Sequence, residues 1–516
     1  MAKVNIDALI PREDFEVMEP AKPSTPKATI SIEDLRSTAF FFSAIRKPDF
    51  QRETNDWDAK KIVDFLLSFV DGDLIPAIIL WRSPSNLLFV IDGSHRISAL
   101  AAWINDDYGD GKISKLFYDD VLPDEQIALA EKTRRMVKKS VGSFEDFEIA
   151  TKYPERVKEN VRSRAKNLGG LGIQLQWVDG DATKAEHSFF RINQQAAPIN
   201  ATELVLLKSR KKPNCIAARA IFRSGKGHKY WSEFTDDRQT EIQDLAKEIN
   251  ELLFSPKLVT PIKTLDIPVG GKLYAAPTLA VILEFVNIVN DVPLNFEKEL
   301  SDDNDGTDTV RFLQRARQVA FRINSIHPSS LGLHPAVYFY SSEGKHKTAS
   351  FFATVNFVIR LEDEKAFDRF TSVRRDFEEV LLQNEFFVQQ ITRKYRQAGG
   401  GYEYVTKFYQ VIFDQLTNGK LPDDVIDNIL ASKDFEYLNT LQDASLVTSP
   451  FFTPNRKSAV FLKEAIKSVP RCQICHGFIH RNSITIDHKV RKSEGGAGSV
   501  DNGQIAHPYC NTTYKH

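Results

Sequence analysis

The motif Cys472-Gln473-Ile474-Cys475 has a counterpart further along the chain, His507-Pro508-Tyr509-Cys510. These two short motifs decide how the C-terminus folds. Two thiolates with this spacing can occupy adjacent corners of a tetrahedron around one metal ion. The second motif repeats the spacing with histidine in the first place. Because three of the chain's 4 cysteines gather here, metal binding is favoured over disulfides. We therefore expect Cys472, Cys475, His507 and Cys510 to hold a structural Zn²⁺.

The residues between the two motifs follow a recognisable order. Residues 483–490 read Ser-Ile-Thr-Ile-Asp-His-Lys-Val, and Ser493, Gly495-Gly496, Asn502 and Asn511 come after them. The stretch from Arg471 to His516 resembles the CxxC-type HNH (ββα-metal) nucleases, whose pattern is roughly CxxC…DHxxPxSxGG…N…CxxCNxxK. The sequence departs from this pattern at three positions, which are Arg491 for the usual proline, His507 for a cysteine, and Lys515 one residue late.

This resemblance implies a role for each polar residue. His488 is the expected general base, because imidazole titrates near neutral pH. Asp487 and Asn511 are expected to bind a catalytic Mg²⁺ or Mn²⁺ through oxygen atoms. Asn502 is expected to brace the loop that carries His488. The other histidines of the module, His476 and His480, are expected to be exposed rather than catalytic.

A second motif lies near the front of the chain, where residues 90–96 read Val-Ile-Asp-Gly-Ser-His-Arg. A glycine turn between a strand and a helix places backbone amides at the helix N-terminus, and with the neighbouring Arg96 these suit a phosphate group. The turn alone is weak evidence, since an ordinary strand–helix connection has the same residues.

The surroundings strengthen this interpretation, because residues 46–53, Trp57, residues 189–193 and Glu203 follow a known order. Together they resemble the DGQQR-motif domain, related to ParB and sulfiredoxin, of GmrSD- and SspE-type modification-dependent anti-phage restriction proteins. The resemblance implies a domain that binds and hydrolyses an NTP (ATP, GTP or CTP) and gates a nuclease. The implied nucleotide-binding residues are Asp92, Gly93, His95, Arg96, Gln51, Arg52 and Asn193. Ser94 stands where sulfiredoxins have a cysteine, which disfavours a redox enzyme.

The expected fold is α+β and multidomain. We predict an irregular N-terminal arm over 1–30, a ParB/sulfiredoxin-like α/β domain over 31–227, a mainly α-helical middle over 228–448, and the ββα-metal HNH zinc module over 456–516. No stretch approaches the ~18 uninterrupted apolar residues of a membrane span, and no signal peptide is evident. The chain is therefore expected to be cytoplasmic, without a membrane partner.

Charge is balanced over the whole chain, with 68 basic and 69 acidic residues, and so gives no indication of a polyanionic partner. From Phe451 onward, however, basic residues clearly outnumber acidic ones, as a phosphate-binding module requires.

The leading hypothesis is an NTP-regulated, metal-dependent endonuclease acting on DNA, in particular modified or phage DNA, in a restriction or anti-phage defence system. Two alternatives stay open. One is a ParB-like nucleotide switch whose zinc module grips DNA without cutting it, and the other is an RNase-type toxin. The sequence leaves open whether the chain forms a homo-oligomer.

Overall fold

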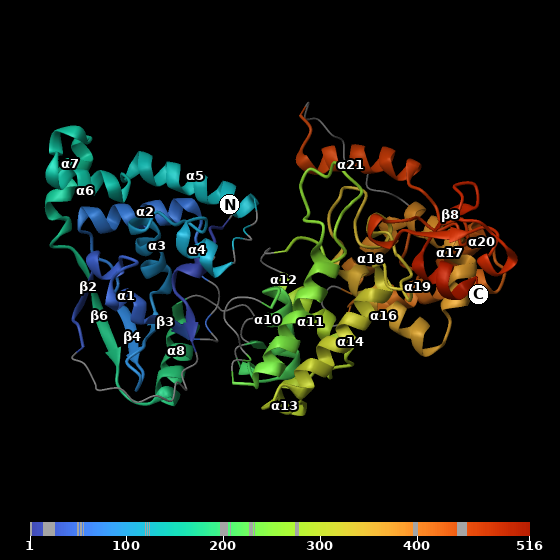
Figure 1. The fold of residues 1–516 in the computed structure, drawn as a ribbon, viewed down its shortest axis with the longest axis horizontal. Coiled ribbons are helices and arrows are strands. Elements are labelled where there is room, and N and C mark those ends of the chain that lie inside the picture. Colours follow the sequence, from blue (N-terminus) through green and yellow to red (C-terminus); the bar gives the residue numbers. More distant parts are fainter. Residues whose placement is uncertain are drawn as a thin grey trace. The chain divides into compact units, whose positions relative to one another are not determined.

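The computed structural model describes the chain except for residues 1–2, 14–25, 49–50, 52–53, 55, 119, 121, 123, 197–204, 207, 226–230, 232, 274–277, 396–400, 441–450 and 516 (Figure 1). The described residues form two compact units. One runs up to Arg210, and the other comprises Lys211–Gly225 and the chain from Trp231 onward. The mixed α and β composition and the small C-terminal module confirm the expected fold class. No described helix is long and apolar enough to cross a membrane.

A six-stranded mixed sheet forms the centre of the first unit, in the order β1-β3-β5-β4-β6-β2. Strands β1, β3 and β5 are parallel to one another, β4 is antiparallel to β5 and parallel to β6, and β2 is antiparallel to β6. The strands are β1 (Arg12–Glu13), β2 (Thr29–Ser31), β3 (Ile45–Pro48), β4 (Ile78–Arg82), β5 (Leu88–Asp92) and β6 (Gly172–Val178).

Helices cover both faces of this sheet. Along β5, Val90 joins the larger core, while Phe89 and Ile91 join a second core with Phe189 of α8. This alternation follows from the two-residue period of a strand, and it explains why β5 is apolar on both faces. The helices are α1 (Phe40–Ala44), α2 (Ala59–Asp71), α3 (Ser94–Ile104), α4 (Lys112–Phe117), α5 (Asp124–Ser140), α6 (Phe144–Lys152), α7 (Glu159–Leu168) and α8 (Ala182–Ala196).

The first residues of the chain differ from the expected irregular arm. Residues 3–13 are described, and Val4, Ile6 and Leu9 are buried in the larger core. Arg12–Glu13 forms edge strand β1, paired with β3. This segment is too short for its apolar residues to show a helical or strand period. For this physical reason the sequence did not predict its structure.

The second unit is mainly helical, as expected for the middle of the chain. Its core is rich in phenylalanine; Phe357 stacks on Phe377 with ring centroids 5.5 Å apart and meets Phe370 edge to face. The helices are α10 (Pro213–Phe222), α11 (Asp236–Phe254), α12 (Thr278–Val289), α13 (Phe296–Glu299), α14 (Thr307–Ile323), α15 (Pro335–Tyr338), α16 (Thr348–Asp363), α17 (Phe367–Gln383), α18 (Glu385–Lys394), α19 (Gly401–Thr417), α20 (Pro422–Ala431) and α21 (Pro454–Ala465).

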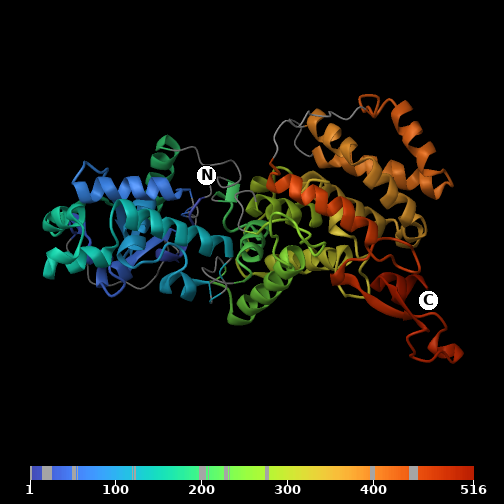
Figure 2. The same cartoon turned by 90° about the horizontal axis from the view of Figure 1, so that it is seen from above.

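The same unit contains the C-terminal module, which packs against this helical region. Strands β7 (Thr485–His488) and β8 (Gly503–Ala506) form an antiparallel hairpin, and a short π-type helix, Cys510–Tyr514, follows. The order is therefore strand, strand, helix. In Figure 2 this last segment lies beside the orange and yellow helices. Tyr509 donates a hydrogen bond to Asp368 of α17 at 2.8 Å, which ties the end of the chain to the helical region.

Candidate functional site

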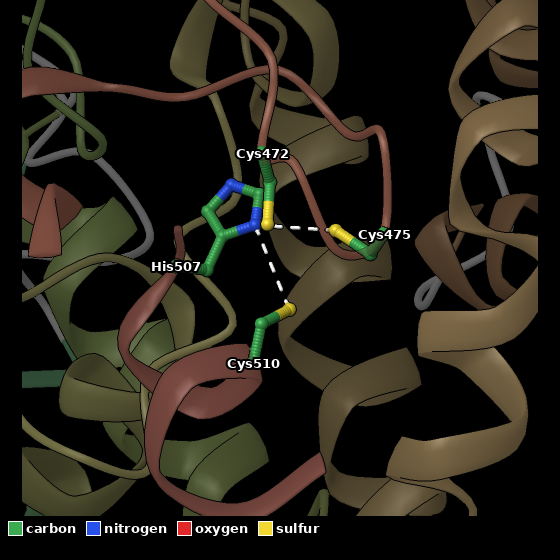
Figure 3. A group of neighbouring side chains, drawn as sticks. All are labelled: Cys472, Cys475, His507 and Cys510. Carbon is green, nitrogen blue, oxygen red and sulfur yellow. Dashed lines mark hydrogen bonds between the residues drawn. The ribbon is translucent and has the colours of Figure 1, made fainter. Parts of the chain in front are cut away.

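Four side chains of the C-terminal module converge on one point (Figure 3). The donor atoms of Cys472, Cys475, His507 and Cys510 all lie within 4.8 Å of one another, and all four residues are buried. The Nδ1 atom of His507 lies 3.3 Å from the Sγ atom of Cys475 and 3.9 Å from that of Cys510. Tetrahedral zinc with bonds of about 2.0–2.3 Å separates its ligand atoms by about 3.3–3.8 Å. The cluster therefore fits the structural zinc expected from the two motifs.

The electrostatics of the cluster also favour a cation. Burial and the guanidinium of Arg374 both lower the pKa of His507, but the neighbouring Cys475 and Cys472 outweigh them and raise this pKa to about 9. Hydrogen bonds with Cys475 and Cys510 lower the pKa of Cys472, so a thiolate forms readily there. A metal ion can take the place of the proton that the neighbouring cysteines favour on His507.

The other ring nitrogen of His507 points away from the sulfur atoms. Its Nε2 lies 3.0 Å from the carbonyl oxygen of Phe478, to which it donates when Nδ1 serves as a ligand. A hydrogen bond of this kind fixes the tautomer and the orientation of a metal-binding imidazole. The cluster therefore has both the ligands and the orientation that a structural site requires.

The predicted cutting residues Asp487 and His488 lie at the end of β7. The carboxylate of Asp487 is buried, and its Oδ2 atom accepts hydrogen bonds from Gln504 Nε2 and Lys515 Nζ, each at 2.7 Å. Gln504 is the cross-strand partner of Asp487 on β8. Burial raises the pKa of Asp487, but the hydrogen bonds from Lys515 and Gln504 outweigh it, and the net shift is downward. Asp487 is therefore held as a carboxylate.

His488 follows on the opposite side of the strand and is half-buried. Among the described residues, neither of its ring nitrogens has a hydrogen-bond partner. A general base needs a nitrogen that can accept a proton from water, and His488 has this freedom in the structure.

Asn502 holds the loop that follows His488. Its Oδ1 accepts from the Val490 amide at 2.8 Å, and its Nδ2 donates to the carbonyls of Val490 at 3.1 Å and Ala497 at 2.8 Å. Its own carbonyl accepts from the Lys489 amide at 2.8 Å. These contacts are the ones that a bracing role needs, and the catalytic importance of Asn502 stays a prediction.

Asn511 lies on the final short helix and faces β7. Its Nδ2 donates to the carbonyl of Ile486 at 3.4 Å, next to Asp487 in the sequence. The hairpin and the helix therefore place Asn511 beside the strand that carries Asp487 and His488. The binding of one ion by both Asp487 and Asn511 stays a prediction.

The front motif forms the expected strand–turn–helix in the first unit. Asp92 ends β5, Gly93 makes the turn with φ +100°, and α3 begins at Ser94. Arg96 Nη2 donates to Asp92 Oδ2 at 2.7 Å and to the Ala77 carbonyl at 3.2 Å. The positive φ angle favours glycine here, and a Cβ atom on residue 93 would also lie close to neighbouring side chains, 3.0 Å from Ile78 and 3.1 Å from Arg96 Nη2.

Two further predicted residues lie at the same helix N-terminus. Gln51 is buried and its Nε2 donates to the Ser94 hydroxyl at 3.3 Å, while its buried Oε1 has no hydrogen-bond partner among the described residues. The His95 ring stacks on Trp57 with centroids 5.6 Å apart. A buried oxygen without a partner is a costly arrangement unless a ligand or water completes it. Arg52 and the side chain of Asn193 (in α8) lie outside the described residues.

A network of buried charges that the sequence did not indicate supports Gln51. The carboxylate of Asp7 accepts from Lys47 Nζ at 2.6 Å, from the Thr54 amide at 2.8 Å and from both terminal nitrogens of Arg12. Arg12 also donates to the Gln51 carbonyl at 3.2 Å. The N-terminal segment thus fixes the backbone beside the helix N-terminus.

The expectation for His480 was wrong, because this residue is buried rather than exposed. Its Nδ1 lies 3.2 Å from Asn324 Oδ1, and burial is the main cause that lowers its pKa to about 4. His476 is exposed, as expected. Gln504 and Arg374 were not singled out from the sequence. For Gln504 the signal was available, because alternate residues of a hairpin place it opposite Asp487.

Comparisons with known proteins found one family match near each end of the chain. Residues 32–210 match the family described as GmrSD restriction endonuclease, N-terminal domain, and residues 472–516 match the family described as HNH endonuclease. No curated protein and no solved structure matches the chain. Both ends of the chain are thus similar to parts of nucleases, and this combination supports a nuclease of a restriction-type system.

Proposed function

We propose that the protein is an NTP-regulated, metal-dependent DNA endonuclease that cuts modified or phage DNA in an anti-phage defence system. The proposal rests on one observation above all. Asp487 and His488 lie at the end of β7, and Asn511 donates to the neighbouring Ile486 carbonyl, in a module that also holds a separate Cys₃His cluster. The cutting residues and the structural metal site thus use different side chains.

The proposed roles follow from the chemistry of each group. His488 accepts a proton from the attacking water, because its ring nitrogens are free of partners among the described residues. Asp487 and Asn511 would hold a Mg²⁺ or Mn²⁺ ion, which supplies charge stabilisation at the phosphate and the leaving oxygen. Asn502 keeps the loop after His488 in place through its three side-chain hydrogen bonds.

The first unit is proposed to sense nucleotide. The N-terminus of α3 offers backbone amides and the Arg96 guanidinium, a combination suited to a phosphate group. Gln51, with its unsatisfied Oε1 close to Ser94, offers a further polar contact for a bound molecule. Hydrolysis of the NTP and its control of the nuclease come from the family resemblance and are part of the proposal.

Cleavage tests the proposal directly. Wild-type protein, His488→Ala and His476→Ala are incubated with Mg²⁺ and either supercoiled plasmid, glucosylated or phosphorothioated DNA, or RNA, with and without NTP. We expect wild type and His476→Ala, which loses an exposed imidazole of the same module, to cut DNA, and His488→Ala to lose at least ~100-fold in rate.

Each other outcome has a clear meaning. If every nucleic acid stays intact but is bound, the zinc module grips DNA without cutting it. Faster cleavage of RNA than of DNA supports an RNase-type toxin instead. Equal rates for wild type and His488→Ala contradict the assignment of the base.

The nucleotide role needs its own assay. Phosphate release from ATP, GTP and CTP is measured for wild type, Arg96→Ala and Arg164→Ala. Arg164 is the control, because it belongs to the same unit but takes no part in the proposed site. It forms an ion pair with Asp71, with Nε and Oδ1 2.6 Å apart. Loss of phosphate release in Arg96→Ala alone supports the proposed site, and unchanged release contradicts it.

A further inference from the structure

Helix α17 of the helical region contacts the metal cluster through Arg374. This side chain is only 1% exposed. Its Nη1 lies 3.2 Å from Nδ1 of His507 and also donates to the Leu331 carbonyl, and its Nη2 donates to the Gly332 carbonyl at 3.0 Å. An arginine buried this deeply needs partners for its whole guanidinium group, and here a residue of the cysteine cluster is among them.

Glu378, one turn further along α17, completes the contact. Its Oε1 accepts from Arg374 Nε at 2.8 Å and from the Tyr338 hydroxyl at 3.1 Å. Its Oε2 accepts from the amide of Phe478 at 2.7 Å. Phe478 in turn provides the carbonyl that lies 3.0 Å from His507 Nε2. Arg374, Glu378, Phe478 and His507 therefore form a closed ring of polar contacts.

The fit is tight on the side of the first cysteine motif as well. A Cβ atom on residue 477 would lie 2.4 Å from Arg374 Nε, so the loop between Cys475 and Phe478 can approach α17 only because residue 477 is glycine. The charges also agree. Zinc bound by three thiolates and one neutral imidazole carries a net negative charge, which an adjacent guanidinium offsets.

We propose that α17 is part of the metal site, with Arg374 and Glu378 acting as positioning residues that orient His507 and retain the zinc ion. When the ion takes Nδ1 of His507, Arg374 gives up its contact with that atom and keeps its hydrogen bonds to Leu331, Gly332 and Glu378. It then acts on His507 through Glu378, which accepts from the Phe478 amide, while the Phe478 carbonyl accepts from His507 Nε2. Since His507 lies between β8 and the helix that carries Asn511, α17 also sets the position of that helix. The helical region thus controls the geometry of the C-terminal module.

Zinc retention in the full-length protein tests this proposal without any measurement of cleavage. Release of zinc to a chromogenic chelator is compared for wild type, Arg374→Lys, Arg374→Ala and Arg375→Ala. The last is a matched control, because Arg375 makes the same i,i+4 pair with Glu379 at 3.2 Å but on the exposed side of α17. Changes to groups that orient a metal ligand weaken metal binding by about 10- to 100-fold. We expect this loss in Arg374→Ala, a smaller loss in Arg374→Lys and none in Arg375→Ala.

A second variant guards against simple misfolding. Arg374→Met combined with Glu378→Gln removes both charges at once and leaves no buried charge alone. We expect this double variant to keep the wild-type far-ultraviolet circular dichroism, to release zinc faster, and to show an altered visible absorption spectrum after Co²⁺ replaces zinc. Release rates and a Co²⁺ spectrum equal to those of wild type, in either the double variant or Arg374→Ala, overturn the proposal. Because no step uses DNA, a failure here is distinct from a failure of the proposed nuclease function.

Discussion

Lys515 Nζ lies 2.7 Å from Oδ2 of Asp487, and Gln504 donates to the same oxygen atom at the same distance. One oxygen of the carboxylate thus receives both donors, and Oδ1 receives neither of them. Lys515 also donates to the His488 carbonyl. The lysine that stands one residue late in the family pattern therefore contacts both candidate cutting residues.

Lys515→Met is expected to raise the pKa of Asp487. In the wild type, the hydrogen bonds from Lys515 and Gln504 outweigh burial and hold this pKa below its ordinary value. Mn²⁺ binding is measured by electron paramagnetic resonance as a function of pH. As the pH falls, binding should therefore be lost at a higher pH in the variant than in wild type. The stabilisation from the pair is present above the unfolded pKa of Asp487 and is lost as pH falls through the lowered folded value.

Lys489→Met is the control for this experiment. Lys489 belongs to the same module and carries the same charge, but its Nζ donates to the Asp501 carbonyl at 2.8 Å rather than to Asp487. Its pH profile should match that of wild type. Equal shifts in both variants would mean that overall charge, not the Asp487 contact, controls the titration.

Gly93→Ala should destabilise the first unit by about 1–2 kcal/mol, because alanine is strained at positive φ. The added Cβ would also press on Arg96 Nη2 at 3.1 Å, so phosphate-containing ligands should bind more weakly. Thermal unfolding with and without NTP measures both effects. Gly169→Ala serves as the comparison, since its φ is not in the left-handed region and its Cβ would meet nothing within 4 Å. Similar stability losses in the two variants would contradict this account.

Cys472→Ser should abolish tight zinc binding. The purified wild type is expected to contain about one zinc per chain, since a structural site uses four protein ligands. Elemental analysis after dialysis measures the ion, and near-ultraviolet circular dichroism reports the packing of the C-terminal module. Cys215→Ser, which alters a buried cysteine of α10 outside the cluster, should retain the ion. Full zinc content in Cys472→Ser would exclude the Cys₃His assignment.

Asp7→Ala should cost about 3–5 kcal/mol of stability, because it removes the carboxylate that pairs with the buried Arg12 and Lys47. Urea unfolding followed by the tryptophan fluorescence of the first unit measures the loss. Lys3→Ala breaks an ion pair with Asp56 in which the lysine side chain is 52% exposed, and it should change stability by less than about 1 kcal/mol. An Asp7→Ala loss as small as that of Lys3→Ala would show that the buried network contributes little.

The parts of the structure that the sequence predicted correctly are those set by short-range spacing. The two cysteine motifs, the hairpin between them, and the turn from β5 to α3 each depend on residues close together in the chain. A metal ligand set also has few chemical alternatives, so its residue types are informative. For this reason the sequence alone groups Cys472, Cys475, His507 and Cys510.

The contacts that the sequence did not reveal join residues far apart in the chain. In the sequence, Arg374 resembles any other charged residue of an amphipathic helix. Only the tertiary fold places it beside His507. His480 was misjudged for the same reason, because its burial depends on Asn324 of the helical region. The N-terminal residues 3–13 are too few to show periodicity, and their burial depends on the completed sheet.

Asn502 closes the loop between β7 and β8 at its base, with bonds to Val490 and Ala497 on either side of the intervening turn. A loop tied in this way can change length and composition beyond the tie without moving the strands. The consequence is one of evolvability. The exposed side chains of Lys492, Ser493 and Glu494 lie between the two tie points and take no part in these bonds, so they can change while Asp487 and His488 stay in place.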